Sequence, residues 1–188
     1  MLTVIKPFCN EFKRESRMDQ VLSKVLAGKD VEYILKTEEL ERKDLRGRKL
    51  LFAVCLSEAG INLEYYRMLE YFRKAPDCLE GAVAAVIVDG SGELYTKALA
   101  RRLVFSVNRA GCTFPGKPLV EATGSLRNFD VMSKILGTDT MGAYEKQVEN
   151  LVNKVLAFTG PEKKERKKIL VVHARSRKTS NSRLHAQH

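Results

Sequence analysis

Two nearly continuous apolar runs, at residues 49–56 and 83–88, constrain the fold of this chain more than any other feature of its sequence. Runs of this length are typical of β-strands buried on both faces, as in parallel sheets. The segment between the runs carries apolar residues at helical spacing and precedes Pro76. These residues are Leu63, Tyr66, Met68, Leu69 and Phe72. A strand, an amphipathic helix and a second buried strand in succession predict an α/β protein with a mostly parallel sheet.

The same alternation extends through residues 1–160, which we predict to form one domain. Further strands are expected at residues 2–5, 31–35 and 118–122. Further helices are expected between Ser16 and Gly28, at 96–110 and at 141–158, while 37–49 is expected to be a charged connection. Five strands and four helices predict a doubly wound, mostly parallel five-stranded sheet in a three-layer sandwich.

Ligands of doubly wound sheets bind outside the carboxyl ends of the strands, where the strand order reverses. In this sequence the corresponding loops are residues 57–62, 89–95 and 123–128. We therefore expect a binding site to be built from these three loops.

The net charge of +10 is concentrated at the end of the chain. Residues 1–160 hold 24 basic and 21 acidic side chains, whereas 161–188 hold 9 basic and 2 acidic ones. A nucleic-acid surface on the domain is therefore not supported. We interpret 161–168 as a charged linker and 169–188 as the first strand and phosphate-type loop of an incomplete second unit. A basic tail, or a strand added to the edge of the first sheet, is the alternative.

The loop in this last segment has the chemistry of a phosphate site, because hydroxyl and backbone N–H groups directly follow an apolar strand. Its segment, ILVVHARSRKTSNS at 169–182, resembles the first strand and phosphate loop of the NAD(P)H-dependent FMN reductases, which have the flavodoxin-like fold. The family loop runs roughly G-S-x-R-x-x-S-x-[NT], and Ala174 and Arg175 stand in place of its first two residues. The resemblance implies that FMN phosphate is bound by Arg177, Thr179, Ser180, Asn181 and Ser182.

A second segment, residues 84–125, resembles the middle of the same family. It contains an apolar strand, a Gly-Ser-x-x-x-Tyr loop, a helix, a further strand and a Thr-Gly-Ser loop, with Gly92 and Glu93 in place of the usual Ser-Pro element. The resemblance implies that the flavin ring is lined by Gly90, Ser91, Tyr95, Thr123, Gly124 and Ser125. It also implies a redox protein that passes electrons from NAD(P)H through FMN to a small acceptor.

Two other classes of function stay open. The first βα loop of the domain, residues 7–16, has two Glu, one Ser and no Gly, and acidic groups repel a phosphate dianion. This composition favours a flavodoxin-like domain that acts without a cofactor, as a binding or homodimerisation module. The basic tail favours a third reading, attachment to nucleic acid or to an anionic surface.

No catalytic side chain and no metal site is predicted. All three histidines lie in the tail, so a Cys–His or Ser–His pair within residues 1–160 is excluded. The four cysteines are widely spaced, lack a CxxC pair and are expected to be reduced. The N-terminus lacks a secretion signal, and no apolar run is long enough to span a bilayer, so we expect a cytoplasmic protein.

Overall fold

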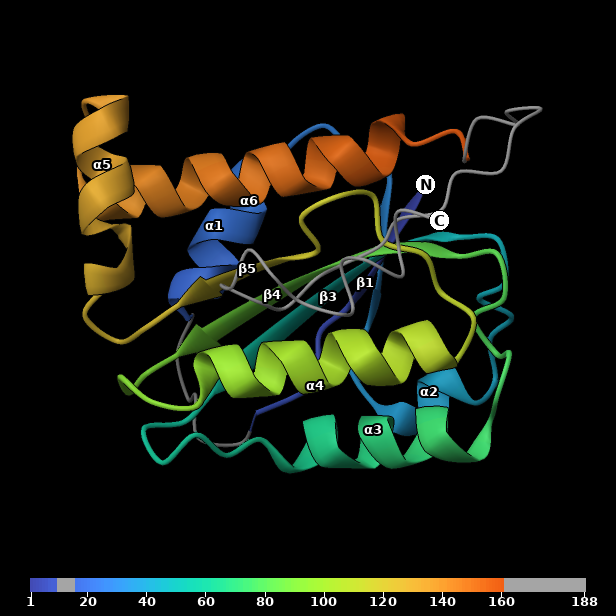
Figure 1. Cartoon of the computed structure of the whole chain (residues 1–188). Coiled ribbons are helices and arrows are strands. Elements are labelled where there is room, and N and C mark those ends of the chain that lie inside the picture. Colours follow the sequence, from blue (N-terminus) through green and yellow to red (C-terminus); the bar gives the residue numbers. More distant parts are fainter. Residues whose placement is uncertain (10–15, 161–188) are drawn as a thin grey trace, which may run out of the picture. The chain divides into compact units, whose positions relative to one another are not determined.

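The computed structural model describes residues 1–9 and 16–160 (Figure 1). Five strands form one sheet in which all neighbours are parallel, in the order β2-β1-β3-β4-β5. Their bounds are β1 (Leu2–Ile5), β2 (Val31–Ile34), β3 (Lys49–Leu56), β4 (Val83–Gly90) and β5 (Leu119–Ala122). The predicted doubly wound parallel sheet is confirmed, and its order reverses between β1 and β3, as in flavodoxin-like proteins.

Helices cover both faces of this sheet, as Figure 1 shows. One face carries α1 (Arg17–Val25), α6 (Thr140–Ala157) and a short stretch formed by η1 (Arg127–Phe129) and α5 (Asp130–Leu136). The other face carries α2 (Thr37–Leu40), α3 (Leu63–Lys74) and α4 (Thr96–Arg109). The two apolar cores between helices and sheet belong to one compact unit, Met1–Phe158.

The two central strands account for most of the burial, as their sequences predict. Seven of the eight residues in each of β3 and β4 are buried. β4 continues two residues beyond the predicted run of 83–88, which places Asp89 within the strand rather than in a loop. A carboxylate is therefore buried at the carboxyl edge of the sheet.

The buried face of α3 agrees with the prediction at Met68 and Phe72 but differs from it at Leu63 and Tyr66. Tyr65, Met68 and Phe72 are buried, whereas Tyr66 and Leu63 are 41% and 68% exposed. Tyr65 can enter the core because its hydroxyl donates to the carbonyl of Leu99 at 2.9 Å. This hydrogen bond satisfies the polar end of the ring, so Tyr65 rather than Tyr66 lies in the core.

Two short helices were not expected from the sequence. α2 lies in the predicted connection 37–49, and its first residue is held by a contact from α3. The Glu64 carboxylate accepts hydrogen bonds from both the backbone N–H and the hydroxyl of Thr37, each at 2.6 Å. α5 ends at Gly137, whose left-handed φ of 65° favours glycine. Within the described residues, no helix is both long and apolar enough to cross a membrane.

Candidate functional site at the carboxyl edge of the sheet

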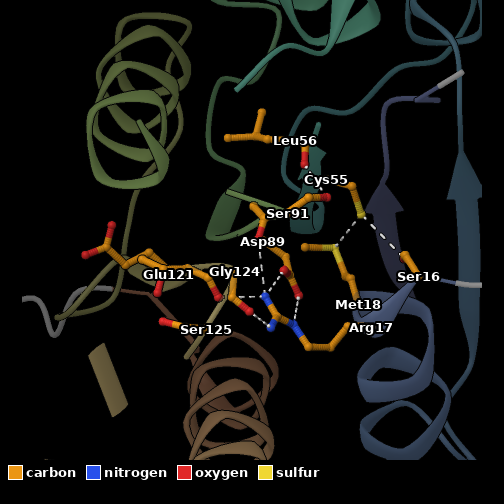
Figure 2. A network of polar contacts seen from close by, with 12 residues as sticks. Ser16, Arg17, Met18, Cys55, Leu56, Asp89, Ser91, Glu121, Gly124 and Ser125 are labelled. Atoms are coloured by element: carbon orange, nitrogen blue, oxygen red, sulfur yellow. Dashed lines mark hydrogen bonds and ion pairs between the residues drawn. The ribbon is translucent and has the colours of Figure 1, made fainter. Parts of the chain in front are cut away.

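Sheet register and one helix cap bring a polar cluster together at the carboxyl ends of β3 and β4 (Figure 2). Cys55 and Asp89 are register partners on these strands, so their side chains point to the same face, which α1 covers. Ser16 begins α1 in a capping box with Asp19: its side chain accepts from the Asp19 backbone, and Asp19 accepts from the Ser16 N–H. Arg17, the first residue of α1, is thereby directed at Asp89.

The Arg17 guanidinium connects three elements. Its Nε donates to Asp89 Oδ2 at 3.1 Å, and its Nη2 forms an ion pair with the same carboxylate. Nη1 donates to the carbonyl of Gly124 at 3.0 Å, and Nη2 donates to the carbonyl of Thr123 at 2.9 Å. One side chain therefore holds α1, the end of β4 and the loop after β5 together.

The pair is largely shielded from water. The side chain of Asp89 is 8% exposed and that of Arg17 is 24% exposed. Burial raises the pKa of Asp89, although the hydrogen bonds and charge of Arg17 oppose the rise. Burial acts to lower the pKa of Arg17, but its contacts with Asp89 outweigh this effect and raise it. The Arg17 charge is therefore matched within the protein rather than offered to an anion.

Tyr144 of α6 closes the inner side of the cluster. Its ring centroid lies 5.9 Å from Cζ of Arg17, within the range of a cation–π contact. Its hydroxyl is buried near Asp89 but makes no hydrogen bond of ordinary length with a described residue. Burial, and then the Asp89 carboxylate, raise the pKa of Tyr144 well above its ordinary value. The phenol is neutral and cannot act as a base.

Cys55 is also held in its neutral form. Its Sγ lies 3.6 Å from the hydroxyl of Ser16 and 3.8 Å from Sδ of Met18. Burial raises the pKa of Cys55 to about 12. Because the thiolate is the nucleophile, Cys55 is not poised for covalent chemistry.

The loops after β3, β4 and β5 are in direct contact with one another. The N–H of Gly124 donates to the carbonyl of Gly92 at 2.9 Å, and the N–H of Ser91 donates to the carbonyl of Leu56 at 3.0 Å. A Cβ added at Gly124 would lie 2.3 Å from the carbonyl oxygen of Ser91, and one at Gly92 would lie 2.5 Å from that of Glu58. The Glu93 carboxylate accepts from the Ser125 N–H, which links the second and third loops again.

Three of the residues expected to line a flavin ring border one small cavity at this edge. A cavity of about 150 Å³ is bordered by Gly90, Ser91 and Gly124 together with the Arg17–Asp89 pair, below the roughly 300 Å³ of small ligand sites. Ser125 lies outside this cavity, and Thr123 contributes only its carbonyl to Arg17. Backbone contacts of Gly124 with Ser91 and Gly92 narrow the space between the loops of 89–95 and 123–128, where the flavin ring is expected.

Tyr95 lies apart from that cavity. It has a left-handed φ of 72° and a side chain that is 60% exposed. A Cβ added at Gly60 would lie 2.7 Å from the Tyr95 ring, so the ring covers the loop after β3.

The predicted linker 161–168 and segment 169–188 lie outside the residues that the structure describes. The same is true of the phosphate-loop residues predicted within that segment, namely Arg177, Thr179, Ser180, Asn181 and Ser182.

A larger cleft opens beside the switch point between β1 and β3. Its volume is about 610 Å³, within the range of small-molecule sites. Its apolar lining includes Phe8, Ile61 and Leu63, which are 54%, 43% and 68% exposed, and its cations are Lys36 and Arg67. Two carboxylates, Glu38 and Glu64, also line the cleft, so its charged groups are mixed in sign.

Asn62 gives this cleft a rigid wall. Its Oδ1 accepts from the Tyr65 N–H at 2.9 Å and caps α3, while its Nδ2 donates to the carbonyls of Cys55 at 2.9 Å and Pro7 at 3.3 Å. The loops after β1 and β3 are therefore tied together at the start of α3.

Among the described residues, no three His, Cys, Asp or Glu side chains are grouped so as to hold a metal ion.

Sequence comparisons do not assign the chain, since no protein-family model and no curated protein matches it. Structural comparison does find similar proteins. A short-chain flavodoxin associated with a non-canonical PDU bacterial microcompartment superimposes with a TM-score of 0.51 at 13% identity, over 82% of this chain and 99% of that one. This chain has the flavodoxin-like fold.

Two further similar structures are a flavone reductase and flavodoxin 2 from Bacillus cereus. The flavone reductase has a TM-score of 0.51 at 10% identity, over 83% of this chain and 63% of that one. Flavodoxin 2 has a TM-score of 0.49 at 13% identity, over 82% and 97%. At 13% and 10% identity, the two superpositions with a TM-score of 0.51 establish the flavodoxin-like architecture but assign no cofactor to this chain.

The sequence did not reveal Arg17, Cys55 or Tyr144 as parts of the site, whereas the predicted loop of 57–62 does border the switch-point cleft through Ile61 and Asn62. One signal was present, because an ionisable residue that ends a buried apolar run, as Asp89 does, needs a charged partner. Nothing in the sequence indicates which of the domain's 24 basic residues provides that partner.

Proposed function

We propose that this chain is a flavodoxin-like redox protein that binds FMN in the cleft beside the β1–β3 switch point. The observation that carries the proposal is the place and size of that cleft, about 610 Å³ at the carboxyl edge where flavodoxin-like sheets take their ligands. The finer assignment, reduction of FMN by NAD(P)H and transfer to a small acceptor, rests on the sequence resemblance.

The residues of this chain would bind and orient the cofactor. Phe8, Ile61 and Leu63 provide apolar surface for the ring. Lys36 and Arg67 provide positive charge for the phosphate, which the Glu38 and Glu64 carboxylates on the same lining oppose. Arg67 is ion-paired with Glu64 at 3.3 Å, and its side chain remains 66% exposed. Bound FMN would supply the electron-transfer chemistry, while the protein controls its position and the access of water.

A titration of FMN into the full chain, followed by flavin fluorescence, tests the proposal. Leu63→Glu should weaken binding at least roughly tenfold, because it places a carboxylate on the apolar wall. Val131→Glu is the matched control, since Val131 is 72% exposed on α5 and Leu63 is 68% exposed. Equal affinity in both variants would overturn this placement of the ligand.

A third variant separates the cleft from the loops named by the sequence resemblance. Leu94 is 67% exposed in the loop after β4 and does not border the cleft. If Leu94→Glu weakens binding and Leu63→Glu does not, the ring lies against the loop of 89–95. Bleaching of bound flavin by NADPH or NADH without oxygen then tests the electron donor.

A cofactor-less binding module is the second candidate, because the loops after β3, β4 and β5 contact one another directly. Absence of flavin quenching even at millimolar FMN, in protein with a cooperative unfolding transition, would favour this candidate over the first.

A further inference from the structure

The seam between α3 and α4 forms a groove that the proposed function does not use. Its volume is about 700 Å³, and Figure 1 shows the two helices side by side on one face of the sheet. Both helices contribute residues at the spacing i, i+3 and i+7, which lie on one helix face. These residues are Tyr66, Leu69 and Arg73 on α3, and Arg102, Phe105 and Arg109 on α4.

The floor of the groove is apolar and accessible. Phe105 is 64% exposed, and Tyr66 is 41% exposed. A second cavity of about 220 Å³ continues the groove toward the start of both helices, because it shares Tyr66 and Arg102 and adds Tyr95. α4 has 14 residues, so the apolar strip runs about 20 Å along the seam. A strip of this length matches about four turns of a partner helix.

Three cations border the strip, and the acidic residue on the same lining is Glu70, on which the charge of Arg73 also acts. Arg73, Arg102 and Arg109 form no ion pair with any residue that the structure describes, whereas Glu70 is already paired with Lys74 at 2.6 Å. Arg109 lies over the ring of Phe105, with Cζ 6.0 Å from the centroid. Three unpaired guanidinium groups therefore surround exposed aromatic surface, the residue types that dominate binding energy in protein interfaces.

We propose that the α3–α4 groove docks an amphipathic helix of a partner protein that carries acidic residues on both sides of an apolar stripe. Apolar side chains of such a helix would lie between Tyr66 and Phe105, in the manner of helix-in-groove recognition. Its carboxylates would meet Arg73, Arg102 and Arg109, which supplies the charge complementarity that selects this partner over a basic one.

The test uses the full chain and two synthetic helical peptides followed by fluorescence anisotropy. One peptide carries a leucine stripe flanked by glutamates, and the other carries lysines in place of the glutamates. The acidic peptide should bind at least roughly tenfold more tightly than the basic one. Arg102→Glu should reverse this preference, while Arg101→Glu, one position along α4 and outside the groove, should change it little.

Phe105→Ser supplies a variant that removes apolar contact from an exposed position and leaves the core intact. It should weaken the acidic peptide without changing the affinity for FMN, which separates this proposal from the proposed function. Equal affinity of the two peptides, or equal effects of Arg101→Glu and Arg102→Glu, would overturn the proposal. Self-association that Phe105→Ser abolishes would overturn it too, because the groove would then hold a second copy of this chain.

Discussion

Arg17 and Asp89 form an ion pair across 72 positions of the chain, with Nε of the arginine 3.1 Å from Oδ2 of the aspartate. The pair lies at the carboxyl edge of the sheet, where a doubly wound fold binds its ligand. The same guanidinium also donates to the carbonyls of Thr123 and Gly124. An internal side chain thus occupies part of the edge that the sequence suggests for a flavin ring.

Removal of the Asp89 charge should destabilise the fold strongly. Asp89→Asn leaves the mostly buried Arg17 cation without its counter-charge, and we expect a loss of about 3 kcal/mol in the free energy of unfolding. Urea unfolding measures this loss. Glu70→Gln, which breaks the exposed pair with Lys74, is the control and should change the free energy of unfolding far less, because water and salt screen an exposed pair. Losses of equal size would contradict the role assigned to the pair.

Gly124→Val should disturb the contact between two loops. The added Cβ would lie 2.3 Å from the Ser91 carbonyl oxygen, so we expect a loss of about 2 kcal/mol from overpacking. Gly116→Ala is the control, because nothing lies within 4 Å there and only its left-handed φ of 74° costs about 1 kcal/mol. If Gly124→Val abolishes FMN binding at unchanged stability, Gly124 approaches the ring directly, as the sequence resemblance implies.

The Asp19 carboxylate should make the free energy of unfolding depend on pH. Burial acts to raise its pKa, but hydrogen bonds from Lys6 and Ser16 outweigh this effect and lower it. A lowered pKa means that the ionised carboxylate stabilises the fold above its ordinary pKa, and that this contribution is lost as the pH falls through the lower folded value.

Asp19→Asn should therefore be less stable than the natural sequence at neutral pH, and the difference should shrink below about pH 4. Urea unfolding across that range measures the difference. A gap that stays constant with pH would show that the charge of Asp19 does not contribute.

The thiol of Cys55 should be unreactive in the folded protein. Burial raises its pKa to about 12, and burial raises that of Cys112 to about 12 as well. Iodoacetamide at mildly alkaline pH, followed by mass spectrometry, should modify both residues only in denaturant, because thiolate and access are both needed. Rapid modification of native Cys55 would mean that the cluster around Ser16 opens.

The strand and helix pattern of the domain could be predicted because its signals are local. The apolar runs at 49–56 and 83–88 became β3 and β4, and Ser16 caps α1 as expected. Continuous apolar runs and cap residues act within a few positions of the chain, so a single sequence reveals them. The failure to predict α2 has a non-local cause, because α2 depends on the contact between Glu64 and Thr37, which no window of neighbouring residues contains.

By itself, the sequence determined the alternation of strands and helices, and with it a parallel sheet whose loops meet at one edge. The tertiary structure decided which residues meet there. It paired Arg17 with Asp89, closed the loop of 89–95 against Gly124, and left the open cleft near Leu63 instead. The physical reason is that periodicity reports which face of an element is buried, whereas a partner 72 positions away is set by strand order and register.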